Sequence, residues 1–187
     1  MLHGVDISSY NPHYRPHGEV DFVIIKATEG RTYVNPHRVA QAAAARKAGC
    51  VVGFYHFLHP RRINAQAKYF VEHCHAREGD ILALDWETTS KGKRASSKQK
   101  DKFLRKVKKL MPHHRVILYC DRHVWNDRRT SHYVADGLWI ASYREAGDPG
   151  IDEKWLFHQY TSTPIDKNVA RFGSRSALRK WAFGHDH

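Results

Sequence analysis

Short apolar runs alternate with helix-like segments over the first two thirds of this chain, and this order restricts the possible fold more than any other feature. Strands that are separated by helices pair in parallel through crossover connections. After residue 120 the connections become shorter, so the last strands have little room for full helices. The sequence therefore predicts an α/β fold, an irregular TIM-like barrel of parallel strands with helices mainly in the first two thirds and short connections near the C-terminus. The expected strands are residues 3–7, 22–28, 51–58, 81–87, 115–120, 137–143, 155–161 and 165–169, and the expected helices are residues 35–48, 64–77 and 96–111.

The size and composition of the chain indicate one folded domain that covers residues 1–187. Hydrophobic residues make up 41% of the chain and aromatic residues 12%, which argues against a disordered protein. No run approaches the roughly 18 apolar residues that a membrane span needs, so we expect no membrane insertion. The three cysteines are too few for a disulfide scaffold and have apolar neighbours, so we expect buried free thiols.

The expected strand at 81–87 has two different faces. One face carries two leucines and Trp86, and the other carries small residues followed by Asp85 and Glu87. Because side chains alternate between the two faces of a strand, the bulky face suits the helix layer and the acidic face suits the barrel lumen. In other expected strands too, polar residues lie toward the C-terminal end, where barrel enzymes place their chemistry.

Asp85 and Glu87 stand on one face of this strand, roughly 6–7 Å apart along it. Cleavage of a glycosidic bond needs a carboxylic acid that protonates the leaving oxygen and a carboxylate that stabilises positive charge at the sugar carbon. An isolated Asp-x-Glu usually lies in a solvated turn, but this one ends a strongly apolar strand, where burying two acids is unfavourable unless they serve a purpose. Negative charge on Asp85 and Asp6 would raise the pKa of Glu87 and keep it protonated. The pair therefore indicates a glycoside hydrolase.

A series of motifs extends over nearly the whole chain: Gly4-Val5-Asp6-Ile7-Ser8, Asp21-Phe22-Val23-Ile24-Ile25-Lys26-Ala27-Thr28-Glu29-Gly30, Gly53-Phe54-Tyr55-His56-Phe57, Leu84-Asp85-Trp86-Glu87, Leu138-Trp139-Ile140-Ala141-Ser142-Tyr143, Gln159-Tyr160-Thr161-Ser162 and Asp166-Lys167-Asn168. In their residues and their order, these motifs resemble those of the family 25 glycoside hydrolases, the Chalaropsis-type lysozymes. Two departures from the family pattern are a short segment before Asp166 and a histidine, His158, at a position where tryptophan is common.

This resemblance implies an N-acetylmuramidase that cleaves the β-1,4 bond between N-acetylmuramic acid and N-acetylglucosamine in bacterial peptidoglycan. It implies that Glu87 is the general acid and that Asp85 stabilises or orients the reacting sugar. Asp6 and Asp166, from the first and last strands, would complete an acidic ring, and Tyr55 would also line the site. A covalent intermediate, assistance by the substrate's own acetamido group and direct attack by water all remain open for the second step.

Six further residues are predicted to contact the substrate or to tune the site. Lys26 falls on the lumen side of its strand, where it serves either as a counter-ion for the acids, which we favour, or as a substrate contact. Aromatic rings with a polar tip suit sugars, although an aromatic residue in a barrel more often belongs to the core. The other five are Glu29, Tyr119, Trp139, Tyr143 and Gln159.

Most of the formal net charge of +12 comes from residues 91–109, which contain ten Lys or Arg against one acid, Asp101. Apolar residues at helical spacing within this segment predict an amphipathic helix with a basic outer face. That face is either a solvated surface or a contact for a polyanion such as an anionic wall polymer. Nucleic acid is a poorer fit, because the cleft expected here is acidic.

No metal or cofactor is expected. His73-Cys74-His75 and His185-Asp186-His187 lack the spacing of a zinc site, and no Gly-rich phosphate loop is visible. The main alternative to a lysozyme is an inactive barrel that binds wall glycan or, through residues 91–109, nucleic acid. Because no signal peptide is visible, we expect a phage endolysin that is made in the host cytoplasm and acts on the bacterial cell wall.

Overall fold

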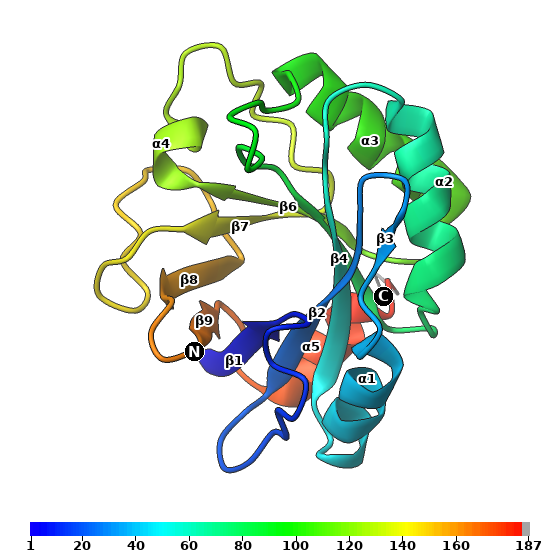
Figure 1. The fold of residues 1–187 in the computed structure, drawn as a ribbon. Coiled ribbons are helices and arrows are strands. Elements are labelled where there is room, and N and C mark those ends of the chain that lie inside the picture. The colour runs from blue at the N-terminus through cyan, green and yellow to red at the C-terminus, as the bar shows by residue number, and fades with distance from the viewer. Residues whose placement is uncertain (185–187) are drawn as a thin grey trace.

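The computed structural model describes residues 1–184. The segment His185-Asp186-His187, which was not expected to form a zinc site, lies outside the described residues. Eight strands form a closed ring, because β1 pairs with both β9 and β2, and a ninth short strand pairs with the outer edge of β2 (Figure 1). This confirms the predicted α/β barrel. The strands of the ring are β1 (Leu2–Ile7), β2 (Phe22–Glu29), β4 (Val51–Phe57), β5 (Ile81–Asp85), β6 (Val116–Asp121), β7 (Gly137–Ala141), β8 (Phe157–Thr161) and β9 (Asp166–Ala170), and the added strand is β3 (Tyr33–Val34).

The prediction that the strands are parallel is wrong for β9, which runs antiparallel to both of its neighbours, β8 and β1. The reason is the length of the connection. Only residues 162–165 join β8 to β9, and a parallel crossover needs a dozen residues or more. As a consequence, the first residue of β9 lies at the same end of the barrel as the last residues of β1.

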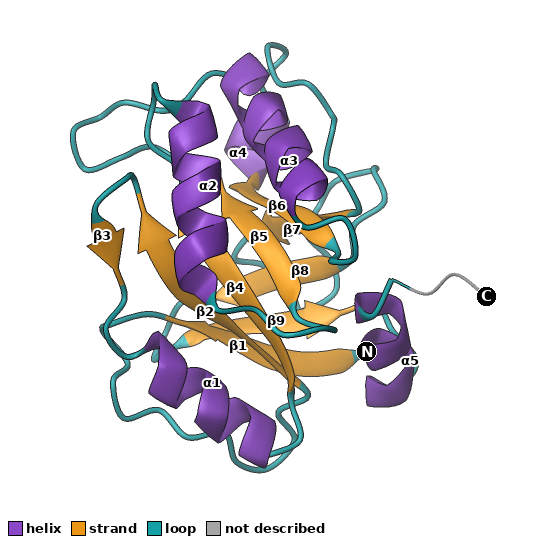
Figure 2. Ribbon diagram, turned by 90° about the vertical axis from the view of Figure 1, so that its right-hand side faces the viewer, coloured by secondary structure: helices purple, strands orange, loops and turns teal. Residues whose placement is uncertain are grey.

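Helices cover the outside of the barrel mainly along the first two thirds of the chain, as predicted. The helices α1 (Arg38–Lys47), α2 (Ile63–Cys74) and α3 (Ser97–Leu110) follow β3, β4 and β5, and α2 and α3 pack side by side (Figure 2). Two helices were not predicted, α4 (Arg122–Trp125) and α5 (Arg175–Ala182). None of the helices within residues 1–184 is both long and apolar enough to cross a membrane.

The predicted basic helix at 91–109 is only partly helical. Ser96 caps α3 by accepting a hydrogen bond from the Gln99 backbone nitrogen, and the Gln99 side chain bonds back to Ser96. This capping box starts the helix at Ser97 and leaves the first six residues of the basic segment outside it. Lys100 is fully buried and ion-paired with Asp101, so the basic face is smaller than the sequence suggested.

The core has an outer and an inner part, as the alternation of side chains predicted. Leu82, Leu84 and Trp86 pack between the sheet and the helices, whereas Ile81 and Ala83 pack inside the barrel. The three cysteines, Cys50, Cys74 and Cys120, are buried free thiols.

The amino ends of the strands are closed by α5. Leu178 and Ala182 are fully buried in the inner cluster, together with Phe22 and Phe157. At Gly4 a Cβ atom would lie 2.4 Å from the Phe22 ring, so the absence of a side chain there makes room for this plug. The barrel is therefore solid at this end, and a cleft can form only at the other end.

Candidate active site

Four carboxyl groups meet at the carboxyl end of the barrel strands. Asp6 lies near the end of β1 and Asp85 is the last residue of β5, while Glu87 follows two residues later. Asp166 is the first residue of β9 and pairs directly with Asp6, because β9 is antiparallel. The strand at 81–87 thus ends at Asp85, two residues earlier than predicted, and Glu87 extends from the loop.

These carboxyl groups line a cleft with a volume of about 200 Å³. Nine of the eleven residues that the sequence analysis selected lie around it, and the other two, Lys26 and Glu29, do not. The nine are Asp6, Tyr55, Asp85, Glu87, Tyr119, Trp139, Tyr143, Gln159 and Asp166.

Lys26 and Glu29 form a separate ion pair beside the cleft. The Lys26 Nζ atom lies 2.6 Å from Glu29 Oε2, and His59 Nε2 lies 2.9 Å from Glu29 Oε1. The Lys26 ammonium also lies over the rings of Tyr33 and Phe57, at 5.4 and 5.2 Å from the ring centroids. Lys26 still lowers the pKa of Asp85 and Glu87 through its charge, so it acts on the acids from a distance while Glu29 is its direct partner.

Asp6 is held by two side-chain amides. Gln159 Nε2 and Asn168 Nδ2 each donate a hydrogen bond of 2.8 Å to Asp6 Oδ2. Burial and the charge of Asp166 nevertheless raise the pKa of Asp6 from 3.8 to about 7, against the opposing effect of the two amides. Asp6 is therefore fixed in position and carries a proton for much of the time near neutral pH.

The side chains of Asp85 and Glu87 face the same cleft and affect each other's pKa. Burial raises the pKa of both carboxyl groups, and the charge of Glu87 raises that of Asp85 further. The Asp85 Oδ1 atom has no hydrogen-bond partner within residues 1–184. The expectation that Asp85 raises the pKa of Glu87 is wrong, because its side chain lowers that pKa, whereas the charge of Asp121 raises it.

The aromatic side chains form the floor and the rim of the cleft. Trp139 is buried beneath it and donates a 2.8 Å hydrogen bond from Nε1 to Asn168 Oδ1, which orients the amide toward Asp6. Tyr119 packs edge-on against Trp139 at 4.6 Å between centroids and donates a 2.9 Å hydrogen bond to Gln159 Oε1. Tyr143 is 63% exposed at the rim, where a sugar ring can reach its face. Burial raises the pKa of Tyr119 and Tyr55, which keeps both hydroxyl groups protonated as donors.

Two residues of the site were missed by the sequence analysis. Asn168 was noted only as part of a motif, although it stands two residues after Asp166 and therefore on the same face of β9. Asp121 ends β6 two residues after Tyr119, and its charge raises the pKa of Glu87. In both cases the alternation of strand faces was a usable signal.

No group of three or more His, Cys, Asp or Glu side chains within residues 1–184 is arranged to hold a metal ion. The cleft itself is lined by four carboxyl groups, aromatic rings and the Gln159 amide. A protonated acid beside a carboxylate, surrounded by aromatic rings and amides, can protonate a glycosidic oxygen and stabilise the positive charge that results.

Comparison with known proteins identifies similar sequences and structures. The sequence profile of glycosyl hydrolases family 25 matches residues 5–169. The chain is 41% identical over 92 residues to the N,O-diacetylmuramidase of Chalaropsis sp, and the matched segment covers 44% of each protein. It is 28% identical over 178 residues to the autolytic lysozyme of Clostridium acetobutylicum, and this match covers 87% of this chain and 51% of the other. This chain thus spans about half the length of these two relatives. A family 25 lysozyme from Aspergillus fumigatus has a similar structure, with a TM-score of 0.82 at 25% identity over 97% of this chain and 98% of the other.

Proposed function

The chain belongs to glycosyl hydrolase family 25, and on this premise we propose that it is a muramidase that cleaves the β-1,4 bond between N-acetylmuramic acid and N-acetylglucosamine in bacterial peptidoglycan. The observation that carries this proposal is the meeting of Asp6, Asp85, Glu87 and Asp166 in one cleft. An inactive barrel that only binds glycan is a poorer account. It has no need to bury Asp85 with an unpartnered oxygen, which is unfavourable for folding.

In the proposed reaction, Glu87, whose pKa is raised by burial, delivers a proton to the glycosidic oxygen. Glu87 is more exposed than Asp85, so it is the member of the pair that a bound glycan reaches. As the bond breaks, Asp85 and Asp6 stabilise the positive charge that develops at the sugar carbon or at groups attached to it. Gln159 and Asn168 keep Asp6 in place for this role.

The test is the lysis of purified bacterial walls, followed by turbidity, with identification of the new reducing ends. A muramidase releases reducing N-acetylmuramic acid, whereas release of reducing N-acetylglucosamine or of free peptide would contradict the proposal. Addition of the protein to intact cells then tests the proposed role in host lysis. If the parent protein lowers the turbidity of the cells and the Glu87→Gln variant does not, the result supports a role in host lysis.

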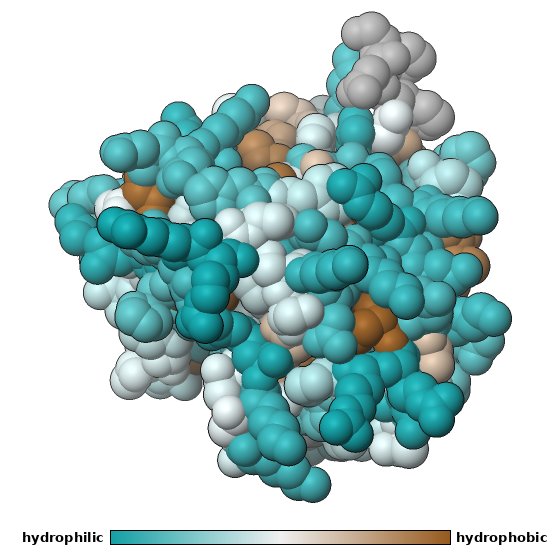
Figure 3. Space-filling model, turned by 90° about the horizontal axis from the view of Figure 1, so that it is seen from above, coloured by the Kyte–Doolittle hydropathy of each residue, from teal (hydrophilic) through white to brown (hydrophobic). Residues whose placement is uncertain are grey.

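We propose in addition that the basic residues of α3 attract anionic wall polymers. Lys98, Lys102 and Lys109 are exposed and, with other residues of α3, line a shallow groove beside Asn64 of α2. The face of the molecule above α2 and α3 is mostly hydrophilic, with only scattered hydrophobic side chains (Figure 3). A surface of this kind favours a charged partner over an apolar one.

Replacing Lys98, Lys102 and Lys109 with Gln tests this contact. We expect wall sedimentation binding to weaken several-fold at low salt and much less at high salt, because exposed charges are screened beyond roughly 8–10 Å at physiological ionic strength. Lys47→Gln, Arg77→Gln and Lys180→Gln together make a matched control, since these exposed cations lie near the closed end of the barrel. Equal binding by the α3 variant and the control would contradict the proposal.

A further inference from the structure

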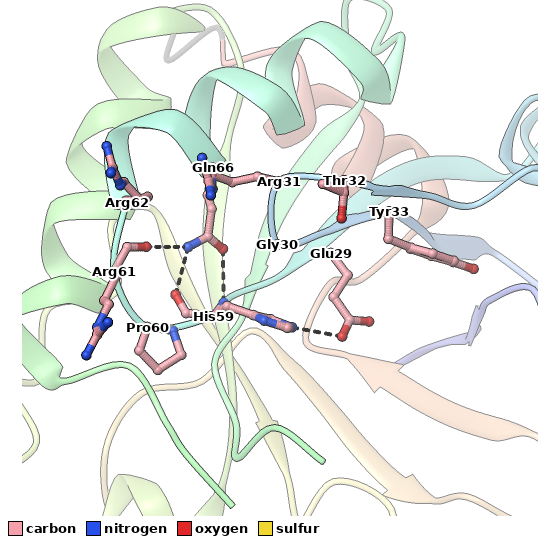
Figure 4. A pocket seen from close by; sticks show the side chains of 10 residues that line it. All are labelled: Glu29, Gly30, Arg31, Thr32, Tyr33, His59, Pro60, Arg61, Arg62 and Gln66. Carbon is pink, nitrogen blue, oxygen red and sulfur yellow. Dashed lines mark hydrogen bonds and ion pairs between the residues drawn. The ribbon is translucent and has the colours of Figure 1, made fainter. Parts of the chain in front are cut away.

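A second and larger cavity opens beside the catalytic cleft, with a volume of about 630 Å³. One side is formed by residues 29–33, at the turn from β2 to β3, and the other by residues 59–62 together with Gln66 of α2 (Figure 4). Apart from Glu29, none of these residues was selected by the sequence analysis. None of them has a part in the proposed cleavage.

The cavity has an excess of positive charge. Arg31, Arg61 and Arg62 are exposed in its lining, and within residues 1–184 no side chain forms an ion pair or a hydrogen bond with any of the three guanidinium groups. Glu29 is the acidic residue of the lining, and it is already paired with Lys26 at 2.6 Å and His59 at 2.9 Å. Since each guanidinium has five N–H donors, the lining offers many donors to an anion, and Arg61 and Arg62 extend in different directions from the loop that carries them (Figure 4).

The backbone that carries two of these arginines is fixed in place. Gln66 is buried, accepts a 2.9 Å hydrogen bond from the His59 backbone nitrogen and donates hydrogen bonds of 2.7 Å to the carbonyl oxygens of His59 and Arg61. Arg61 and Arg62 both have positive φ angles, 70° and 50°, which L side chains rarely adopt. Gln66 thus sets the direction in which both side chains leave the backbone (Figure 4). An anion that binds here meets a wall that is already ordered, which reduces the entropy lost on binding.

The cavity and the catalytic acids lie on neighbouring strands at the same end of the barrel. Glu29 pairs with Phe57, and Phe57 pairs with Asp85. Neighbouring strands are about 4.8 Å apart, so the edge of the cavity lies about 10 Å from the Asp85 backbone. A group that enters the cavity can therefore be attached to a sugar that occupies the cleft.

We propose that this cavity binds the free carboxylates of the peptide stem carried by a muramic acid residue in the cleft. This inference rests on the proposed function, because it assumes a peptidoglycan substrate. Carboxylates match the planar fork of donors on a guanidinium and bind it through two parallel hydrogen bonds. The stem is attached to the muramic acid itself, so it is the anion that a glycan in the cleft brings within reach of the arginines.

A direct binding measurement tests the proposal without requiring cleavage. The probe is a soluble N-acetylmuramoyl peptide with free carboxylates, titrated calorimetrically into the full chain and into a variant with Arg31→Gln, Arg61→Gln and Arg62→Gln. We expect the triple variant to bind about tenfold or more weakly, as the loss of charge-assisted hydrogen bonds implies. A probe whose carboxylates are amidated should bind both proteins equally weakly. The Lys47→Gln, Arg77→Gln and Lys180→Gln control, which has the same change in charge, should bind the free probe like the parent.

Steady-state turnover separates this inference from the proposed function. The triple variant should raise KM for glycan fragments that carry stems and leave turnover of stem-free fragments unchanged. If the parent cleaves both kinds of fragment but the triple variant binds the probe as tightly as the parent does, the inference is wrong and the proposed function stands. If the parent cleaves neither, the proposed function fails, and the titration alone decides the inference. Retention of a poly(glycerol phosphate) chain by the parent, with no affinity for the muramoyl peptide, would also overturn the inference.

Discussion

At the carboxyl end of the barrel four carboxyl groups share one cleft, and an oxygen of Asp85 has no hydrogen-bond partner among the described residues. At the amino end, by contrast, α5 covers the lumen with Leu178, Ala182 and neighbouring aromatic rings. The first arrangement opposes folding, because buried carboxyl groups lose their hydration. The second favours folding, because it removes apolar surface from water. The two ends show that the chain tolerates an unfavourable cleft because the rest of the barrel is closely packed. Four substitutions test whether the open end of the barrel supports activity and the closed end supports stability.

The largest effect on activity is expected from Glu87→Gln. The amide keeps the size of the side chain but cannot donate the proton, so the rate of wall lysis should fall on the order of a hundred- to ten-thousand-fold. The melting temperature should remain at least as high as that of the parent, because one buried carboxyl group is removed. Normal lysis by the folded variant would show that another group supplies the proton.

The largest effect on stability is expected at the opposite end, from Leu178→Ala. Removal of a fully buried leucine side chain should lower the free energy of unfolding by about 2–5 kcal/mol in urea denaturation. Ser176→Ala on the exposed side of α5 is a matched control that should change little. Turnover of soluble glycan by the folded fraction of Leu178→Ala should match the parent. A large fall in kcat would mean that the two ends are not independent.

Asp6→Asn should sharpen the comparison, because it should stabilise the protein while lowering its activity. The pKa of Asp6 is about 7 in the folded protein and about 4 in the unfolded chain, so between these values the folded state binds more protons and stability falls as pH rises. Asparagine lacks this titration and can still accept hydrogen bonds from Gln159 and Asn168. We expect a gain of about 2–4 kcal/mol at pH 8 and little change at pH 3, measured by thermal unfolding at both pH values. An equal change in stability at the two pH values would show that the pKa of Asp6 is not raised in the folded protein.

The smallest of the four effects is a shift of the pH profile in Asp85→Asn. The side chain of Asp85 lowers the pKa of Glu87, so without this acid Glu87 should keep its proton to higher pH, and the alkaline limb of kcat/KM for a soluble fragment should move to higher pH. Maximal activity should also fall, because Asp85 no longer stabilises positive charge. An alkaline limb at the same pH as in the parent would show that the two carboxyl groups titrate independently.

The strands, and the position of Asp85 and Glu87 in one cleft, could be predicted because they depend on local pattern. Alternation along residues 81–87 placed Leu82 and Trp86 on the helix side and Ala83 inside the barrel, as the structure has them. The helix α5 was not predicted, because it is short and only Leu178 and Ala182 are buried on it. Its position across the lumen depends on contacts with distant strands.

Three features of the site depend on contacts that a sequence pattern does not contain. The antiparallel direction of β9 sets where Asp166 lies, and it follows from the short turn before this strand. Lys26 was expected beside the acids, but its nearest acid is Glu29, three residues away on the same strand. The arginine cavity joins residues 29–33 to residues 59–66 through the pairing of β2 with β4, so its charges are scattered in the sequence.

The hydrogen bonds that hold Asp6 also bear on when the cleft is completed during synthesis. Gln159 and Asn168 are separated from Asp6 by 153 and 162 positions. A ribosome adds about 5–20 residues per second, so Asp85 and Glu87 emerge several seconds before the strand that fixes Asp6. Until β8 and β9 have emerged, β1 has no partner on one side and the ring is open. The nascent chain therefore lacks a complete cleft until both of these strands have been synthesised, and shorter chains cannot carry the assembled site.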